Sequence, residues 1–208
     1  MTTLNEILLD SSSTLDLSAS LPVGEELTLR QNYANQAVKD AASNGQFSEF
    51  TTEYTLYTTG STNVPISGFR ELELNPMVLS SGGWTEYPEI DIKDKYTASG
   101  NFCYVTGNPQ SGYALQFSDT LTADMTLSVI YQRYPSGMPS LSSICELSEA
   151  SYVTRKIESY VFYSRGDDKF PTAEARANTV LLNMVGREMK GAGGQSRDTK
   201  SKFSNPLG

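Results

Sequence analysis

The C-terminal third of the chain carries the pattern of a helical hairpin, which constrains the fold more than any other feature. Apolar residues recur three and four apart in two stretches, Glu149 to Arg165 and residues 171–190. The turn between them is Gly166-Asp167-Asp168-Lys169, and Gly166 suits the left-handed position that follows a helix. Ser148 is predicted to cap the first helix. A connection this short predicts two antiparallel helices that share their apolar faces.

Two more helices are predicted at the N-terminus. Thr3-Leu4-Asn5-Glu6 fits a capping box and precedes three apolar residues. The polar residues 10–13 are expected to end this short helix. A longer helix is predicted from Glu25 to Ser43, where apolar residues keep the helical period and Asn44-Gly45 follows.

Between Phe50 and Tyr134 the period of the apolar residues changes from helical spacing to alternation, which predicts about six antiparallel strands. Pro65 makes residues 64–66 an edge strand, because proline has no N–H to donate to a sheet. The clearest alternation lies in residues 113–117 and 125–131. Residues 118–124 are expected to join these two strands as a hairpin.

This order predicts an α+β fold. Strands and helices do not alternate, so a parallel sheet is not expected. We predict a helical bundle domain made of two N-terminal and two C-terminal helices (residues 1–48 with 140–190). A β insertion domain would occupy residues 49–139. Residues 191–208 lack any periodicity and would form a flexible, disordered C-terminal docking arm.

The charge distribution limits the kinds of partner that the chain is expected to bind. The chain has a net charge of −8, while residues 191–208 hold three basic residues and one acidic residue, which leaves −10 for residues 1–190. Such a body is not expected to grip nucleic acid. The basic tail either docks on an acidic surface or stays solvated. Neither a signal peptide nor a transmembrane helix is expected. Cys103 and Cys145 are predicted to be buried and reduced.

No residue is assigned a catalytic, cofactor-binding or metal-binding role. The chain has no histidine, which removes histidine-based acid–base chemistry and histidine metal sites. Tyr152 and Lys156 have the spacing of short-chain dehydrogenases, but the glycine-rich nucleotide site of those enzymes is absent. The acidic residues Glu89, Asp91 and Asp94 lack the glycine and the late glutamate of a calcium loop.

Aromatic residues on the first helix of the hairpin outnumber those that one helix face can bury. Tyr152, Phe162 and Tyr163 are candidates for a subunit interface, because aromatic residues are enriched there. A wide core beneath the β region remains the alternative. Trp84, which follows two glycines, is expected to be a packing anchor.

The whole pattern resembles the head-to-tail adaptor (connector) proteins of tailed bacteriophages, of the tail tubular protein A type. The resemblance rests on the element order and on local strings: Tyr131-Gln132-Arg133-Tyr134, Met138-Pro139, Cys145, Tyr152 with Lys156, and Ser164-Arg165-Gly166. The β region departs from the pattern, since it varies among such proteins.

The resemblance implies a structural protein of the virion neck that is assembled in the host cytoplasm and is not an enzyme. It implies a ring, usually dodecameric, between the portal protein and a tail or nozzle protein, with DNA passing through without sequence reading and no membrane contact. The docking arm would reach the portal through Gly191, Arg197, Lys200, Lys202 and Phe203. The alternative is a β-rich module of a phage tail that binds a glycan or a receptor.

Overall fold

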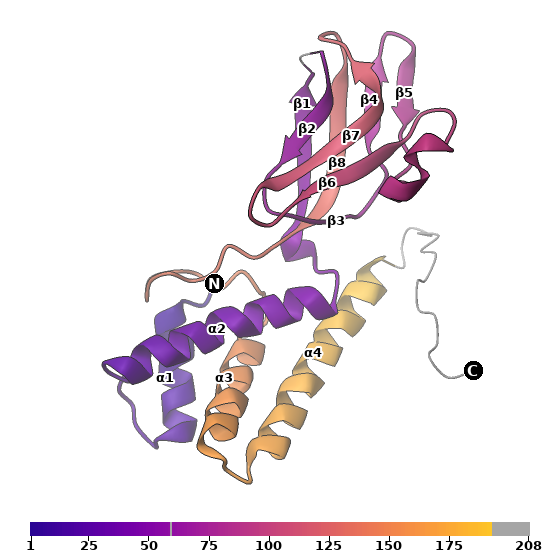
Figure 1. Cartoon of the computed structure of the whole chain (residues 1–208). Helices are drawn as coiled ribbons and strands as arrows, with labels where there is room; N and C mark the ends of the chain where they lie inside the picture. The colour runs from indigo at the N-terminus through magenta and orange to yellow at the C-terminus, as the bar shows by residue number, and fades with distance from the viewer. Residues whose placement is uncertain (59, 193–208) are drawn as a thin grey trace, which may run out of the picture.

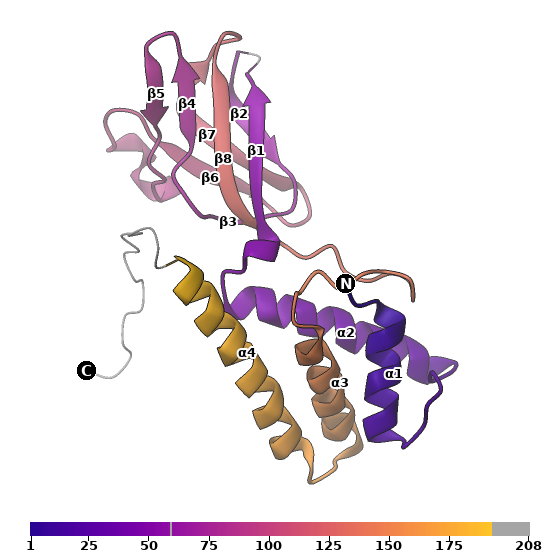
Figure 2. The same ribbon diagram turned by 180° about the vertical axis from the view of Figure 1, so that it is seen from behind.

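The structure, a computed structural model, describes residues 1–58 and 60–192 and forms a helical lobe and a β lobe (Figures 1 and 2). The described residues form four α-helices: α1 (Leu4–Leu15), α2 (Glu25–Asn44), α3 (Ala150–Arg165) and α4 (Phe170–Ala192). They also form eight strands, which all pair antiparallel with the other named strands. The α+β class is therefore confirmed.

Two helix ends predicted from capping residues are confirmed, and a third is not. The Thr3 side chain accepts from the Glu6 backbone N–H, and the Glu6 carboxylate accepts from the Thr3 N–H at 2.7 Å, which confirms the capping box. Gly166 adopts φ 65° and ends α3 as expected. Ser148 is not the cap of α3: Glu149 occupies that position, without a side-chain capping bond.

The prediction that residues 10–13 end α1 is wrong. The helix continues to Leu15 because Ser11 and Ser12 are buried against the rest of the lobe. Ser11 Oγ donates to the Leu8 carbonyl, and Ser12 Oγ accepts from Arg30 Nη1 at 3.2 Å. Tertiary contacts thus override the weak helix propensity of a serine run.

In the helical lobe α3 is central and packs against α1, α2 and α4. In Figures 1 and 2, α1 and α4 lie on opposite sides of α3, and α2 crosses over them next to the β lobe. The core contains side chains from all four helices, among them Ile7, Ala37, Ile157 and Ala177. Cys145 belongs to this core and Cys103 to the core of the β lobe, and both are free thiols as expected.

The strands of the β lobe form two sheets around one core. The first sheet has the order β1-β8-β4-β5, with β3 also paired to β8; the second has the order β2-β7-β6. Leu115 and Phe117 of β7 lie in the same apolar core as Leu127 and Val129 of β8. The bounds are β1 (Thr51–Tyr57), β2 (Ser61–Ile66), β3 (Phe69–Leu72), β4 (Met77–Ser80), β5 (Gly83–Glu86), β6 (Cys103–Asn108), β7 (Gly112–Leu121) and β8 (Thr126–Arg133).

Two strand predictions are wrong. The described residues hold eight strands rather than about six, since β4 and β5 form a short hairpin at residues 77–86. Strands β7 and β8 do not pair as a hairpin, because β7 pairs with β2 and β6 while β8 pairs with β1, β3 and β4. Both strands carry one apolar face, and opposing sheets bury two such faces more completely than a pair within one sheet.

Polar contacts join the two lobes. Arg70 of β3 donates from Nη1 to the carbonyl oxygens of Ala42 and Gly45, so a cation from the β lobe satisfies acceptors at the C-terminal end of α2. Arg133 at the end of β8 pairs with Glu146 at 3.3 Å. These contacts set the β lobe on one end of the helical lobe.

Candidate interaction surfaces

The structure separates the three aromatic residues that the sequence analysis assigned to a subunit interface. Tyr152 is almost fully buried in the core of the helical lobe. It packs inside its own chain and is not available to a neighbouring subunit, so its assignment is corrected to the alternative, a core residue. It faces inward because α3 is surrounded on three sides by the other helices.

Phe162 and Tyr163 lie in the last turn of α3, just before the connection to α4. The Lys169 ammonium group lies 5.8 Å from the ring centre of the half-buried Phe162. The Tyr163 ring packs against Phe170 with centroids 5.1 Å apart but stays largely exposed. Of the three, Tyr163 is therefore the side chain most open to a partner.

The Tyr152–Lys156 pair belongs to a polar cluster between helices and has no access to a substrate. Lys156 Nζ lies 2.5 Å from Glu174 Oε1, and Ser159 Oγ donates to the other oxygen of Glu174. Burial, with the negative charges of Asp40 and Glu174, raises the pKa of the Tyr152 phenol. A tyrosine that acts as an acid or base needs its pKa lowered toward neutrality. This cluster fits helix packing rather than catalysis.

The residues of the predicted docking arm fall mostly beyond the described part of the chain. Gly191 lies within α4, which ends at Ala192, so the helix runs slightly further than predicted. Arg197, Lys200, Lys202 and Phe203 lie outside the described residues. Within residues 1–58 and 60–192 no group of three or more metal-ligating side chains is found, and no helix is apolar and long enough to cross a bilayer.

Trp84 is not a packing anchor. It lies on β5, the edge strand of the larger sheet, and about half of its surface is exposed. The tight turn that joins β4 to β5 aligns it with Leu79 of the neighbouring strand. Its ring is therefore open to solvent rather than held in the core of the β lobe.

A polar groove of about 430 Å³ runs between α2 and residues 135–139. Asn35 from α2 accepts the Met138 backbone N–H at 2.6 Å, and Gln31 Nε2 donates to the Met138 carbonyl at 2.9 Å. These bonds hold the chain that leaves the β lobe against α2. The groove therefore follows the contact between α2 and residues 135–139, and its lining has no cluster of charged side chains that could bind a ligand.

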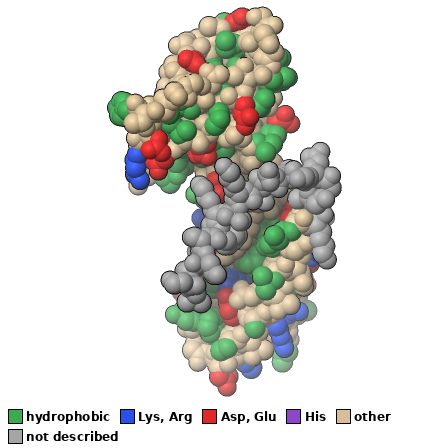
Figure 3. Space-filling model, turned by 90° about the vertical axis from the view of Figure 1, so that its right-hand side faces the viewer, with side chains coloured by type: hydrophobic (Ala, Val, Ile, Leu, Met, Phe, Trp, Pro, Cys, Tyr) green, Lys and Arg blue, Asp and Glu red, His purple; other side chains and the backbone are tan. Residues whose placement is uncertain are grey.

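One face of α4 points away from the helical lobe and lacks charge. Its residues recur four and three apart, as in a coiled-coil seam, and are Ala175, Thr179, Leu182, Gly186 and Met189. Leu182 and Met189 are 70% and 72% exposed. The Thr179 hydroxyl donates to the Ala175 carbonyl, so it is satisfied within the helix. We call these five residues the α4 face. Figure 3, viewed from this side of the molecule, shows hydrophobic side chains at the surface of both lobes.

A second apolar surface lies on the loop between α1 and α2. Leu17 and Val23 are 93% and 81% exposed. Leu17 has φ 51° directly after the C-cap Asp16, a position where helices usually place glycine. The left-handed conformation costs a leucine about 1–2 kcal/mol. The strained backbone and the exposed apolar side chains are both unfavourable for the isolated chain. Local strain of this kind is typical of a functional position. We call Leu17 and Val23 the loop tip.

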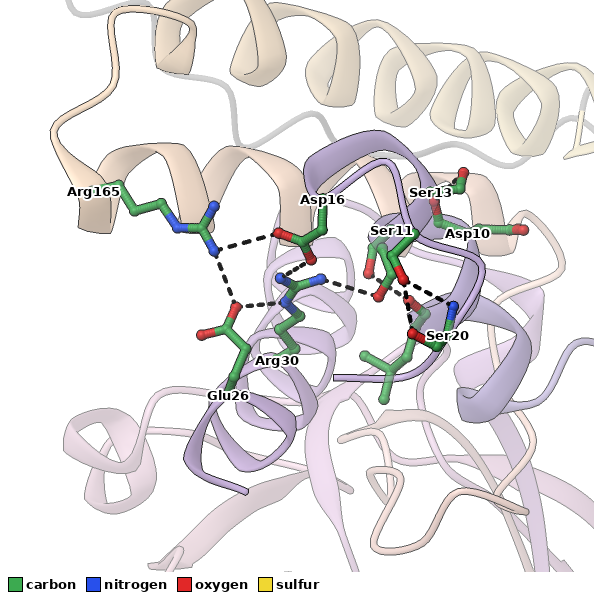
Figure 4. Close-up of polar contacts among 11 residues, drawn as sticks. Asp10, Ser11, Ser13, Asp16, Ser20, Glu26, Arg30 and Arg165 are labelled. Carbon is green, nitrogen blue, oxygen red and sulfur yellow. Dashed lines mark hydrogen bonds and ion pairs between the residues drawn. The ribbon is translucent and has the colours of Figure 1, made fainter. Parts of the chain in front are cut away.

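An ion network holds the base of this loop (Figure 4). The buried Arg30 pairs with Asp16 at 2.6 Å and with Glu26 at 2.7 Å. Arg165, at the end of α3, reaches the same two carboxylates at 3.8 and 3.4 Å. The ends of α1 and α3 and the start of α2 are thereby fixed to one another, and the loop tip projects from a rigid base.

Neither the loop tip nor the α4 face was predicted from the sequence. One signal was present: Leu181 and Leu182 are adjacent, and neighbouring residues on a helix point about 100° apart, so both cannot face one core equally. Comparison of the chain with protein-family models and with curated protein sequences finds no match.

Proposed function

We propose that the chain is a structural virion protein, a head-to-tail adaptor that forms a ring beneath the portal of a tailed bacteriophage and gives the tail its attachment platform. The observation that carries the proposal is a pair of exposed apolar surfaces, the loop tip and the α4 face, on the helical lobe. A cyclic homo-oligomer needs two different faces on each protomer, and this lobe offers them.

The proposed architecture follows the same logic. Two N-terminal and two C-terminal helices act as one bundle that packs side by side with its neighbours, usually as a dodecamer. Residues 49–139 are the insertion that faces the tail or nozzle protein. The role is non-catalytic and needs no cofactor or metal. The protein resides in the neck of the virion, away from membranes, after assembly in the host cytoplasm.

The charge of the body supports passage of DNA through such a ring. Residues 49–139 hold ten acidic and four basic residues, a net charge of −6, and residues 1–48 hold six acidic and two basic residues, a net charge of −4. A channel wall of this sign repels phosphates, so genomic DNA moves through without adhering.

The basic segment after α4 is proposed as the portal-docking arm. Arg197, Lys200 and Lys202 supply its charge, and Phe203 supplies an apolar anchor. Ordering of the segment on the portal would couple folding to binding. Truncation after Ala192 keeps α4 whole, so the truncated protein should keep its helical circular dichroism and lose binding to portal rings. Undiminished binding would refute the arm.

The ring itself is tested by electron microscopy of the purified chain, alone and mixed with purified portal protein encoded in the same genome. The expected result is a ring with a central channel, stacked coaxially on the portal. Absence of rings in both samples would refute the proposal. Light scattering after size exclusion measures the number of copies.

One observation favours a second candidate, a β module that binds a glycan or receptor at a phage tail. Trp84 is exposed at the edge of the sheet, and exposed aromatic rings stack on sugars and fill receptor pockets. Binding of the chain to a glycan array, lost in Trp84→Ala but kept in Tyr57→Ala, would support this candidate. A blank array would remove it.

A further inference from the structure

The loop tip and the α4 face lie on opposite sides of the helical lobe. Helix α3 separates α1 from α4, and Figures 1 and 2 place the α1–α2 connection at one side of the lobe and α4 at the other. Each surface exposes two large apolar side chains that nothing in the described chain covers. A surface of this kind is unfavourable for an isolated chain in water.

We propose that the loop tip of one copy docks on the α4 face of the next copy, so that Leu17 and Val23 pack against Leu182 and Met189. The inference deepens the ring proposed above by naming its contact. Gly186 lies between the two large side chains of the α4 face, and a Cβ there would meet no atom within 4 Å. This opening lets a leucine from a neighbouring loop approach the helix closely.

Charge complementarity identifies a second copy of the chain as the occupant. The first 29 residues hold five acidic side chains and no lysine or arginine: Glu6, Asp10, Asp16, Glu25 and Glu26. Among the described side chains of α4, Arg176 and Arg187 are exposed and Glu174 and Glu188 are partly buried; Arg187 also pairs with Glu149 of its own chain at 3.0 Å. Asp16 and Glu26 already pair with Arg30 and Arg165, so the acidic group left beside the loop tip is the exposed Glu25, two residues after Val23. Its charge is complementary to Arg176 at the border of the α4 face and steers the two surfaces together.

The placement also selects the kind of symmetry. A two-fold dimer would either pair α4 with α4, which leaves both loop tips in water, or bring both surfaces of one copy against a single partner, which their placement on opposite sides of the lobe prevents. A head-to-tail contact covers one loop tip and one α4 face at every junction. It repeats from copy to copy and gives a ring wherever the rotation closes.

Cysteine crosslinking tests this contact. The native Cys103 and Cys145 are buried, so the wild-type protein provides a background without crosslinks. The double variant Leu17→Cys/Leu182→Cys, treated with a short bis-maleimide, should give a ladder of covalent oligomers. A mixture of the two single variants, distinguished by tags of different mass, should stop at the mixed dimer. Adding Met189→Asp to the double variant should abolish the ladder.

The pair Tyr96→Cys/Leu182→Cys is the matched control, because Tyr96 is similarly exposed (86% against 93% for Leu17) but lies on the β lobe. Self-linked dimers of either single variant, or a ladder no stronger than that of this control, would overturn the proposed contact. A ladder without portal binding would keep the contact and reject the adaptor role. Rings seen on portals without the mixed crosslink would reject the contact and keep the role.

Discussion

Replacing Arg30 with alanine should be among the most damaging single changes in the helical lobe. Its guanidinium group is 1% exposed and donates to Asp16 Oδ2 at 2.6 Å, Glu26 Oε1 at 2.7 Å and Ser12 Oγ at 3.2 Å. The alanine variant loses all three bonds and leaves a cavity. It also leaves two carboxylates close together with only Arg165 to offset their charge.

The magnitude follows from the burial of each partner. Removing one member of a buried ion pair costs about 3–5 kcal/mol, because the other member stays buried without a counter-charge. Here the carboxylates are 36% exposed and regain some water, so we expect about 3 kcal/mol, the lower end of that range. Arg165 meets the same carboxylates but is 46% exposed, and Arg165→Ala should cost about 0.5 kcal/mol.

Urea denaturation followed by circular dichroism at a helical wavelength measures this difference, because the signal reports chiefly on the helical lobe. Arg30→Lys should fall between the two alanine variants, since lysine keeps the charge and loses the planar fork that serves three acceptors. Equal destabilisation by Arg30→Ala and Arg165→Ala would refute the reasoning, as it would show that burial of Arg30 adds nothing to the network.

Three further predictions concern other parts of the chain. Burial opposes ionisation of Glu174, but hydrogen bonds from Lys156 and Ser159 outweigh it and lower the Glu174 pKa. Its contribution to stability should be present at neutral pH and be lost as the pH falls through this lowered pKa, on the acid side of the ordinary glutamate range. Burial raises the pKa of Cys103 to about 12, so a thiol reagent at pH 8 should leave it unmodified until the protein unfolds. Gly107→Ala should destabilise the β lobe by about 1–3 kcal/mol, because φ is 97° and a Cβ would collide with a carbonyl oxygen of β7.

Each of these predictions has a control variant or an outcome that would contradict it. Lys156→Met should flatten the acid limb of the stability profile, and an unchanged limb would contradict the assigned cause. Reaction of Cys103 as fast as a free thiol in the native protein would contradict its burial. Gly100→Ala has a similar φ of 83° but open space around a Cβ, so it should cost less than Gly107→Ala in thermal unfolding.

The helices could be predicted because their signals are local. A capping box at Thr3 and Glu6 needs only four residues, and the left-handed glycine at position 166 depends on the turn itself. The end of α1 could not be predicted, because Ser12 stays helical through a bond to Arg30, eighteen residues away. Sequence spacing does not show which distant donor will satisfy a serine.

The strands show the same limit at the level of the sheet. Alternation placed the buried residues of β7 and β8 correctly, with Leu115 and Leu127 both in the core. Alternation shows which face of a strand is apolar but not whether the opposing apolar face belongs to the same sheet. The pattern therefore predicted a hairpin between β7 and β8, although the two strands lie in different sheets.

Interaction surfaces are harder still to predict from the sequence, because the exposure of an apolar side chain depends on how the elements pack around it and not on the residue type alone. Tyr152 and Trp84 are both aromatic residues with apolar neighbours in sequence, yet the first is buried by three helices and the second is exposed at a sheet edge. Leu181 and Leu182 are identical residues, and the orientation of α4 on α3 alone decides that Leu182 faces water. An apolar residue is a candidate contact when no other part of the folded chain covers it. An interaction surface is therefore recognised from the packing of the structure and not from the composition of the sequence. By that criterion Leu17 is the strongest candidate in the chain, because it is exposed and also holds a backbone conformation that disfavours leucine.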